Sequence, residues 1–523
     1  MISGCLRRVL QQILVTKVEK RDERVIAVGI SIDSLLCHGL PTEPDTDAGT
    51  ILVTGASGYI GGRLVPELTA RGYNVRVMVR RYPSEYKALW PGCEVVVADA
   101  LDMEALRGAL EGVSLAYYLI HSMLLGREEF ARADIRAASN FRRAAEERNI
   151  RRIIYLGGLG DVAKGLSKHL RSRIEVSEEL CSGSVKVTVL RAAVIIGSGS
   201  ASYEIMGNLV KKLPVIPEPR AAKSLCQPIS IRDIVKYLVA VLEIEETSGK
   251  MFDVGGSEVM SYSEMLRKTA AVLGVKRVFV PVSFFSIGGY SYITSLLTPV
   301  PGPITRCLME GLKNDVVCRE NRIKEYVDFP MVGFEEAIER AIAKEKKDRV
   351  KTRWSNAYYP SKKLLPKLDD LKEAPQYKAF ASLVTGKDAA KLFSSICAVG
   401  GPEGWFHGNW LWRLRGAIDR ILLGVGTSRG RRKMSHLKVN DVVGFWRVED
   451  LKVNRRLLLR SELKLPGNAW LEFNISEKED SRELSITAWY YTGSVLGKLY
   501  WYFFLPFHHF IFKGLIEQIE ERS

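Results

Sequence analysis

The sequence predicts an α/β fold, a doubly wound parallel sheet with helices on both faces, followed by a separate α+β domain. Three observations predict it. From Thr50 onward short apolar runs alternate with helical stretches. A glycine-rich turn follows the first of these runs. The last third of the chain changes to segments in which apolar and polar residues alternate. Because 523 residues exceed the size at which one core usually stops growing, two or three domains are expected.

The elements of the first domain follow one another at regular spacing. Six strands are expected, at Ile51 to Thr54, Val75 to Val79, Glu94 to Ala98, Leu115 to Ile120, Arg152 to Leu156 and Val187 to Arg191. Helices are expected between them, at Gly61 to Arg71, Met103 to Leu110 and Arg127 to Arg148. Such a βαβ series predicts parallel strands joined by crossover helices.

The first strand-to-helix turn carries the strongest motif, TGASGYIGG, in which Gly55, Gly58 and Gly61 stand three residues apart. Gly55 allows the tight turn, Gly58 lets backbone approach a pyrophosphate, and Gly61 lets the helix pack near the strand. Amide groups at the start of the helix attract anions. Turns also use glycine for steric reasons alone, but the flanking strand and helix favour a dinucleotide-binding Rossmann domain.

The end of the second strand bears on which dinucleotide is bound. An acidic residue about 20 positions after the glycine loop would hold the ribose of NAD, but VRVMV runs into Arg80 and Arg81. Arginines suit a 2′-phosphate, so NADP is the expected cofactor, with NAD as the alternative if these arginines are only a solvated edge. After the third strand, Asp99 is placed to meet the adenine, or else to cap the helix that begins near Met103.

Seven motifs follow one another from residue 50 to residue 340: TGASGYIGG, ADALD, YYLIHSM, RIIYLGGL, LRAAVIIGSGSAS, QPISIRDIVKYL and FDVGGSEVMSYSEML. In these motifs the chain resembles the extended and atypical short-chain dehydrogenases/reductases, of the NAD-dependent epimerase/dehydratase type. The resemblance implies that QPISIRDIV returns the chain to the sheet and that residues 192 to 330 build much of the substrate side. It also implies a set of dinucleotide contacts: Gly55, Ser57, Gly58, Tyr59, Ile60, Gly61, Arg80, Asp99, Ala100, Leu119 and Ile120.

The catalytic signature departs from that family. Its members use a Tyr and a Lys four residues apart on one helix face, whereas the matching positions here are His169 and Arg173. Gly157 and Gly158 replace the Ser or Thr expected after the fifth strand. Two interpretations are open. His169 is a proton donor and Arg173 holds the nicotinamide ribose, or both are surface residues of a fold that binds a nucleotide without turning it over.

Outside this domain the composition predicts the remaining organisation. Residues 1–48 lack the apolar run of a signal peptide and are expected to be an extension, either disordered or a short amphipathic helix, with the dinucleotide-binding domain at 49–342. The charge-dense stretch 343–399 is expected to be a linker. The net charge of +16 selects no partner, and no pattern typical of nucleic-acid binding accompanies it. Eight scattered cysteines without zinc spacing indicate reduced thiols, no metal site and a cytoplasmic protein.

Residues 400–523 are expected to form the second domain, a curved antiparallel sheet with a long final helix. This pattern resembles the START-like helix-grip fold, and GNAWLEF and LYWYFFLPFHHFIFKGL resemble an uncharacterised domain of the DUF2867 type. That resemblance implies a hydrophobic ligand between sheet and helix. Four aromatic residues either line such a cavity or pack in the core: Trp470, Trp489, Tyr490 and Trp501. The final helix is expected to pack on the sheet, or to lean on a membrane surface without spanning it.

Together the two halves predict an NAD(P)-dependent oxidoreductase of atypical type that acts on a hydrophobic carbonyl or alcohol. The alternative is a nucleotide-binding protein without turnover, either a redox sensor like the NmrA-type regulators or an accessory protein like the related subunit of respiratory complex I. Loss of the Tyr/Lys pair favours this alternative. A lipid-binding module with a vestigial Rossmann half is the least favoured, because the glycine loop is intact.

Overall fold

The chain divides into two units, which are described separately. A computed structural model describes residues 35–80, 83–121, 127–160, 167–282, 286–347, 350, 352–356, 367–371, 373–401, 403–427, 437–479 and 481–523. The first unit contains the described residues up to Tyr203 together with Val215–Ser283 and Cys307–Ala341. The second unit contains Glu204–Pro214, Phe284–Arg306 and the chain from Ile342 onward.

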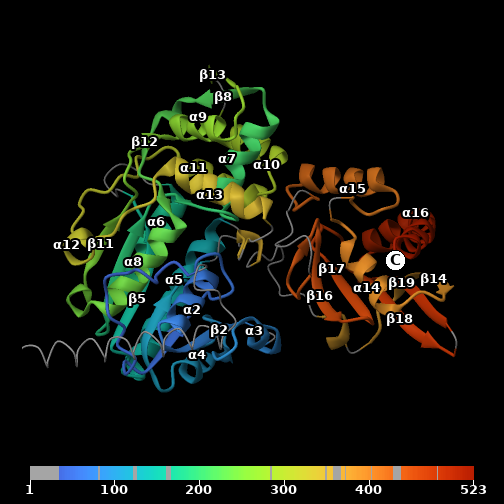
Figure 1. The fold of residues 1–523 in the computed structure, drawn as a ribbon, viewed down its shortest axis with the longest axis horizontal. Coiled ribbons are helices and arrows are strands. Elements are labelled where there is room, and N and C mark those ends of the chain that lie inside the picture. The colour runs from blue at the N-terminus through green and yellow to red at the C-terminus, as the bar shows by residue number, and fades with distance from the viewer. Residues whose placement is uncertain are drawn as a thin grey trace, which may run out of the picture. The chain divides into compact units, whose positions relative to one another are not determined.

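A seven-stranded parallel sheet forms the centre of the first unit (Figure 1). Its order is β11-β6-β5-β4-β1-β2-β3, so the order reverses between β1 and β4. The strands are β1 (Thr50–Val53), β2 (Asn74–Val79), β3 (Glu94–Val97), β4 (Val113–Tyr118), β5 (Arg152–Gly158), β6 (Lys186–Ala192) and β11 (Met251–Val254). The predicted α/β fold, its six expected strands and its doubly wound topology are therefore confirmed, and β11 adds a seventh strand.

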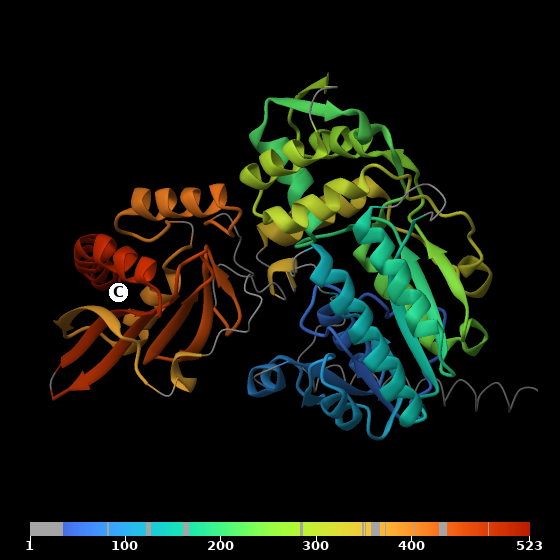
Figure 2. The ribbon, with the colours of Figure 1, turned by 180° about the vertical axis from the view of Figure 1, so that it is seen from behind.

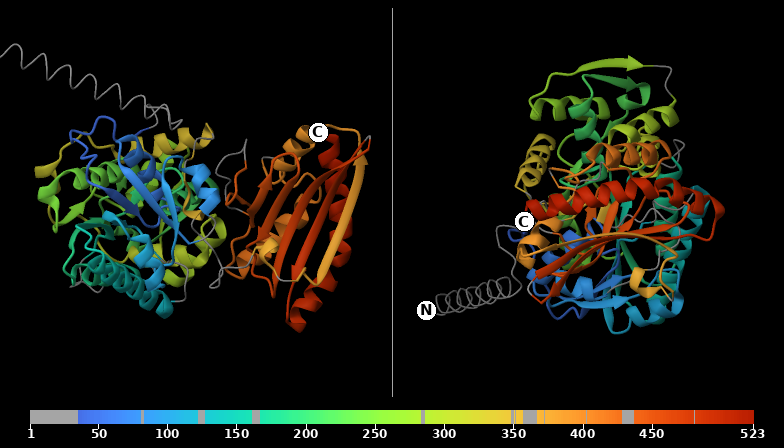
Figure 3. Two further views of the ribbon diagram at one scale, coloured as in Figure 1. Left: turned by 90° about the horizontal axis from the view of Figure 1, so that it is seen from below. Right: turned by 90° about the vertical axis from the view of Figure 1, so that its right-hand side faces the viewer.

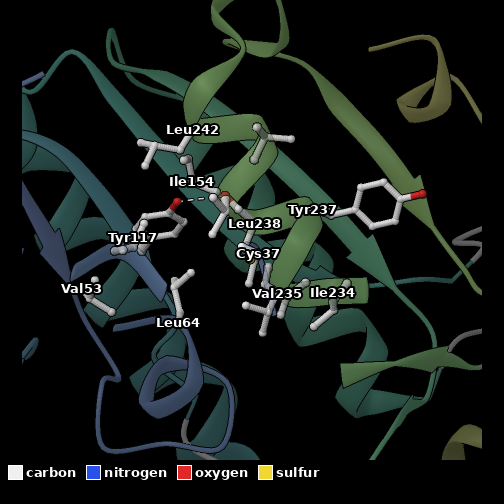
Figure 4. Packing of buried hydrophobic residues seen from close by; sticks show 14 of the residues in the cluster. Cys37, Val53, Leu64, Tyr117, Ile154, Ile234, Val235, Tyr237, Leu238 and Leu242 are labelled. Atoms are coloured by element: carbon white, nitrogen blue, oxygen red, sulfur yellow. Dashed lines mark hydrogen bonds between the residues drawn. The ribbon is translucent and has the colours of Figure 1, made fainter. Parts of the chain in front are cut away.

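Helices cover both faces of this sheet (Figures 1 and 2). They are α2 (Gly61–Ala70), α3 (Pro83–Leu89), α4 (Met103–Ala109), α5 (Arg127–Glu147), α6 (Lys168–Cys181) and α8 (Ile231–Glu243). Side chains along a strand alternate between the two faces of the sheet, so neighbouring residues of β1 belong to different core clusters. Leu52 packs into the cluster with α4, α5 and α6, whereas Ile51 and Val53 pack into the cluster with α2 and α8. On that second face the Tyr117 hydroxyl donates to the Leu238 carbonyl at 2.8 Å (Figure 4).

Residues 35–48 belong to the packed unit, so the expectation that the fold begins at residue 49 is wrong for this stretch. Leu36 and Cys37 are buried in the core cluster of α2 and α8. Their backbone amides donate to the buried Glu67 carboxylate at 2.9 and 3.0 Å. Arg71 donates to the Cys37 carbonyl at 2.9 Å and also pairs with the buried Glu243. The predicted extension over residues 1–34 lies outside the described residues.

The chain between β6 and α13 forms small sheets and helices, which are divided between the two units. Gln227, in the predicted returning segment, donates to the Gly256 carbonyl at 2.8 Å and accepts from the Cys318 amide at 3.1 Å. It thereby fastens three distant stretches together. The elements are β7 (Ile195–Ile196), α7 (Ala201–Lys212), β8 (Val215–Pro219), β9 (Leu225–Cys226), β10 (Ile229–Ser230), β12 (Met260–Ser261), α9 (Tyr262–Val272), β13 (Val278–Val282), α10 (Ile287–Leu297), α11 (Gly302–Gly311), α12 (Ile323–Tyr326) and α13 (Phe334–Lys346).

The second unit is built on a six-stranded antiparallel sheet of order β14-β19-β18-β17-β16-β15, which confirms the predicted change of fold class (Figure 3). Leu459, Leu471 and Ile486 belong to its apolar face, which is buried. Helices α14 and α16 pack against the sheet. The elements are β14 (Tyr377–Thr385), α14 (Ala389–Ala398), α15 (Asn409–Ile421), β15 (Val442–Val443), β16 (Trp446–Lys452), β17 (Arg456–Ser461), β18 (Asn468–Lys478), β19 (Ser481–Tyr491) and α16 (Val495–Glu521).

Two expectations for this half are corrected. The predicted linker 343–399 contains the edge strand β14 and the helix α14, because alternate residues of YKAFASLVT fit the edge of the sheet. The four predicted aromatic residues do not surround one cavity. Trp470 and Trp489 are cross-strand partners that hydrogen-bond Glu449 and Glu472, whereas Tyr490, on the other face, stacks on Trp501 with ring centroids 5.6 Å apart.

Candidate functional site

The glycine loop lies at the reversal point of the large sheet. β1 has β4 on one side and β2 on the other. After β1 the chain enters α2 on one face of the sheet, and after β4 it continues to α5 on the opposite face. The two connections therefore diverge at the carboxyl edge between these strands. In open α/β sheets this is the position at which ligands bind.

Glycine is required in this loop by close contacts. Gly55 has a φ of +62°, and a Cβ added to it would lie 2.4 Å from the Leu119 carbonyl oxygen. A Cβ on Gly61 would lie 2.5 Å from the Gly55 carbonyl oxygen. The Thr54 hydroxyl adds a polar tie, since it donates to the Tyr117 carbonyl at 2.9 Å and accepts from the Leu119 amide at 3.1 Å. The loop backbone is thus pressed between the end of β4 and the start of α2.

The start of α2 has the electrostatics of an anion site. Among the described residues no side chain caps this helix, and its first turn contains no acidic residue. The buried Arg63 lies in the first turn, with its guanidinium 4.4 Å from the Tyr59 ring centroid, and it donates to the Ser198 carbonyl at 2.8 Å. Helix amides and a nearby guanidinium both favour negative charge. This end of the helix therefore suits a phosphate group.

The other predicted dinucleotide contacts lie at the carboxyl ends of neighbouring strands. Arg80 is exposed and directly follows β2. Asp99 and Ala100 follow β3, and Leu119 and Ile120 follow β4. Ser57, Gly58 and Ile60 are half-buried in the glycine loop itself. Topology therefore gathers these positions along one edge, and their contact with a dinucleotide stays a prediction. Arg81 lies outside the described residues.

The alternative role of Asp99 as a helix cap is wrong. The cap of α4 is Asp102, whose carboxylate accepts from the Ala105 amide at 3.1 Å. Asp99 instead accepts from the Leu101 amide at 2.9 Å, within its own turn. Its side chain is half-buried rather than committed to the helix. The assignment of Asp99 to the adenine side is thereby left as the interpretation to test.

A cluster of titratable side chains surrounds His169 at the start of α6. His121 lies three residues after the end of β4, and its ring centroid is 5.1 Å from that of His169. His121 Nδ1 is 3.5 Å from a carboxylate oxygen of the buried Asp134 on α5. His169 Nδ1 is itself buried and has no hydrogen-bond partner among the described residues. Two imidazoles and a carboxylate thus share one place beside the carboxyl ends of β4 and β5.

The environment of this cluster favours the uncharged form of His169. Burial, reinforced by His121 and Arg173, holds the pKa of His169 well below its usual value. Burial and Arg173 also lower the pKa of His121, while Asp134 acts in the opposite direction. A neutral imidazole can accept a proton or donate a hydrogen bond to a carbonyl oxygen. Strongly perturbed groups in contact with one another are a common feature of functional sites.

The Arg173 side chain is bonded to the sheet rather than exposed to solvent. It donates to the Leu156 carbonyl at 2.6 Å, and its guanidinium lies 5.1 Å from the Tyr155 ring centroid. The Tyr155 hydroxyl in turn donates to the Arg173 carbonyl at 3.2 Å. The interpretation of His169 and Arg173 as mere surface residues therefore does not describe their packing, because both side chains are partly buried and Arg173 is anchored to β5.

Sequence reasoning missed His121 and Asp134. His121 stands in YYLIH, one residue beyond the predicted fourth strand, which is a position at the binding edge and a usable signal. Asp134 lies inside a helix rich in charged residues, where nothing in the local pattern separates it from its neighbours. Their convergence on His169 depends on the order of β4 and β5 and on how α5 and α6 pack.

Each half of the chain contains a stretch that matches a known protein family. Residues 47–296 match the NmrA-like family, and residues 373–515 match a protein family of unknown function, DUF2867. The chain is 26% identical over 226 residues to the mitochondrial NADH dehydrogenase [ubiquinone] 1 alpha subcomplex subunit 9 of Arabidopsis thaliana, covering 41% of this chain and 55% of that protein. It therefore spans about half the length of that relative.

Two further proteins resemble the first half. Ceramide reductase of Caulobacter vibrioides is 28% identical over 244 residues, which covers 44% of this chain and 73% of that protein. The crystal structure of Citrobacter sp. triphenylmethane reductase complexed with NADP(H) has a TM-score of 0.46 at 18% identity, and the match covers 56% of this chain and 99% of that one. Of the helices in the described part of the chain, none has both the length and the apolar composition needed to cross a bilayer.

Proposed function

We propose that this chain is an NAD(P)-dependent oxidoreductase of hydrophobic carbonyls or alcohols. It carries an NmrA-like domain with the NAD(P)-binding fold of the short-chain dehydrogenases at residues 47–296 and a DUF2867 domain at 373–515. The observation that carries the proposal is the uncapped start of α2 behind a glycine loop with no room for a side chain. That combination suits a pyrophosphate.

The residues present fit a nicotinamide dinucleotide. The loop offers backbone where a Cβ would collide with Leu119 and Gly55, and Arg63 adds positive charge behind it. Gly55, Gly58 and Gly61 would hold the pyrophosphate, Asp99 and Ala100 the adenine side, and Leu119 and Ile120 the nicotinamide side. When bound, the nicotinamide supplies or accepts a hydride.

Arg80 makes NADP the proposed form. Its exposed side chain follows β2, the neighbour of β1, where a ribose phosphate would be met. Arg80→Ala should weaken NADPH binding roughly tenfold or more, because a charge-assisted contact contributes about 1.5–3 kcal/mol, and it should leave NADH binding almost unchanged. Fluorescence titration of both cofactors measures this. Lys276→Ala, which removes an exposed charge elsewhere in the same unit, is the control. Equal NADPH affinity in wild type and Arg80→Ala would refute the assignment.

His169 is the proposed group that exchanges a proton with the substrate oxygen. Because its pKa is lowered, the ring is held in its neutral form, which can hydrogen-bond a carbonyl oxygen and has a free nitrogen lone pair for the proton of an alcohol. His121 and Asp134 would position the ring, since the carboxylate lies 3.5 Å from His121 Nδ1. Arg173 fixes the other side of the helix to β5. This arrangement replaces the Tyr/Lys pair by different chemistry at the same spacing.

Turnover of a panel of quinones, long-chain aldehydes and ketones with NADPH tests this role. His169→Ala should lower kcat by about 10²–10⁴-fold while NADPH affinity stays within about twofold. Asp134→Asn should shift the pH profile of kcat/KM, which a purely structural role would not do. The proposal fails for this residue if His169→Ala turns over substrate at the wild-type rate.

A second candidate, a dinucleotide-binding protein without turnover, is favoured by one observation. His169 and Arg173 stand where the Tyr and Lys of the family belong. The Arabidopsis thaliana relative is a subunit of NADH dehydrogenase, which supports an accessory role as part of this candidate. Binding of NADPH without oxidation across the whole panel would favour this candidate. Native mass spectrometry of the purified chain would show which nucleotide and which apolar molecule it retains.

A further inference from the structure

Helix α15 in the second unit has its polarity reversed. Trp410, Leu414, Ile418 and Ile421 are 65%, 50%, 42% and 61% exposed, and their spacing of four, four and three residues places them on one side of the helix. Its buried residues include the charged Asp419 and Arg420. An ordinary surface helix shows the opposite arrangement.

Both buried charged side chains of α15 form hydrogen bonds with backbone groups. The Asp419 carboxylate accepts from the Gly426 amide at 2.9 Å and from the Lys464 amide at 2.8 Å. Arg420 donates to the carbonyls of Ser295 and Val425. These contacts fix the rotation of α15 about its axis, so the apolar side is held outward. The exposed stripe is therefore a fixed feature of the surface rather than a core face that has not yet packed.

Helix α16 presents a second apolar stripe over its residues up to Phe510. Leu499, Tyr502, Phe503 and Phe510 are 64%, 62%, 67% and 59% exposed. The opposite side of the same helix is buried and contains Trp501, Phe512 and Leu515, which explains why the helix is apolar nearly all round. From residue 484 to residue 516 the sequence has no acidic residue.

The two stripes adjoin. Arg415 Nε on α15 donates to the Tyr500 hydroxyl on α16 at 3.3 Å, and the His407 and Phe510 rings lie 5.1 Å apart. A hollow of about 530 Å³ is lined by residues from both helices and the preceding turn: His407, Gly408, Asn409, Trp410, Arg413 and Phe510. Figure 1 labels α15 and α16 in the second unit. We call the exposed residues of α15, and those of α16 up to Lys513, the α15–α16 face.

We propose that the α15–α16 face docks on an anionic membrane surface and inserts its aromatic and aliphatic side chains at the boundary between headgroups and acyl chains. Charge selects this occupant, because the exposed charged residues of the face, Arg413, Lys498 and Lys513, are all basic. Apolar and aromatic side chains ringed by basic ones are the pattern of interfacial membrane helices. The inference stands on the second unit alone and does not depend on dinucleotide binding.

Sedimentation with vesicles tests the proposal on the full chain. Vesicles of 70% phosphatidylcholine and 30% phosphatidylglycerol should bind the protein, pure phosphatidylcholine should bind it more weakly, and 0.5 M salt should reduce binding. The double variant Leu499→Glu, Phe503→Glu should bind at least about tenfold more weakly, since each carboxylate must leave water. Val453→Glu, at a 69% exposed apolar position between β16 and β17, is the matched control and should bind like wild type.

A second measurement does not rely on a disruptive variant. Brominated lipid should quench the fluorescence of Trp410 in the bound protein, and the conservative variant Trp410→Phe should lose that part of the quenching. The proposal is overturned if anionic vesicles bind no protein, if the double variant binds as tightly as wild type, or if brominated lipid quenches both proteins equally. It is also overturned if the face proves to be covered by a second copy, so that the double variant converts a dimer to a monomer in size-exclusion chromatography.

Discussion

Replacing Gly55 by alanine separates two reasons why the loop needs glycine. A φ of +62° costs an L-residue about 1–2 kcal/mol. The new Cβ would also lie 2.4 Å from the Leu119 carbonyl oxygen, and relieving such an overlap costs about 1–3 kcal/mol. Gly55→Ala should therefore lower the free energy of unfolding of the first unit by about 2–5 kcal/mol.

The chain contains a matched control. Gly112 has a φ of +69° but nothing within 4 Å of its added Cβ, so Gly112→Ala should lose only the conformational part, about 1–2 kcal/mol. The difference between the two variants measures the contact of the loop with the end of β4.

Thermal unfolding of the full chain provides the assay. The transition to follow is the one that NADPH shifts to higher temperature, because a ligand stabilises the unit that binds it. Each kcal/mol should move that Tm by about 2–4 °C. Gly112→Ala should also bind NADPH like wild type, whereas Gly55→Ala should not. Equal losses of stability in the two variants would refute the claim that the loop and β4 are in close contact.

Two further predictions concern buried carboxylates. Burial raises the pKa of Asp233 to about 6 from an ordinary value of 3.8. The stability that its protonated form contributes is therefore present below pH 4 and is lost as the pH rises through 6. Asp233→Asn should remove this pH dependence and be more stable at pH 7.5 by up to about 3 kcal/mol, measured as urea midpoints at pH 4.5 and 7.5. Glu67→Ala would leave the Leu36 and Cys37 amides without their acceptor, so it should lower the free energy of unfolding by about 2–4 kcal/mol and speed proteolysis within residues 35–48. Glu111→Ala, at an exposed position, is the control and should change stability very little. Slow proteolysis of Glu67→Ala would contradict the packing of residues 35–48 against α2.

Much of the first unit could be predicted because its signals are local. Each strand of the sheet is a short apolar run, and Gly55 and Gly61 mark a turn whose geometry is set within eight residues. The sequence order of strands and helices then restricts the topology, since parallel crossovers are nearly always right-handed. The binding edge follows from that topology without knowledge of any side-chain contact.

The features that could not be predicted depend on contacts between distant residues. His121 and His169 are separated by 48 positions and meet only through the order of β4 and β5. The packing of residues 35–48 depends on Glu67, an acidic residue in the middle of a helix, where solvent exposure would be the ordinary expectation. The apolar stripe of α15 faces outward because Asp419, on the opposite side of the helix, is bonded to neighbouring backbone. Apolar periodicity alone would assign the stripe to the core.

The second of the two glycines that end β5 is not required there by its backbone or by its surroundings. Gly158 has no left-handed backbone, and a Cβ there would meet the side chains of Leu170 and Arg173 at ordinary contact distances of 3.4 and 3.5 Å. A β-carbon at this position therefore fits without rearrangement of α6. The end of β5 thus has room for the first atom of a side chain beside Arg173, next to the His169 cluster. Gly158→Ser would test whether the site also accepts the hydroxyl that the resemblance to the dehydrogenases leads one to expect after this strand.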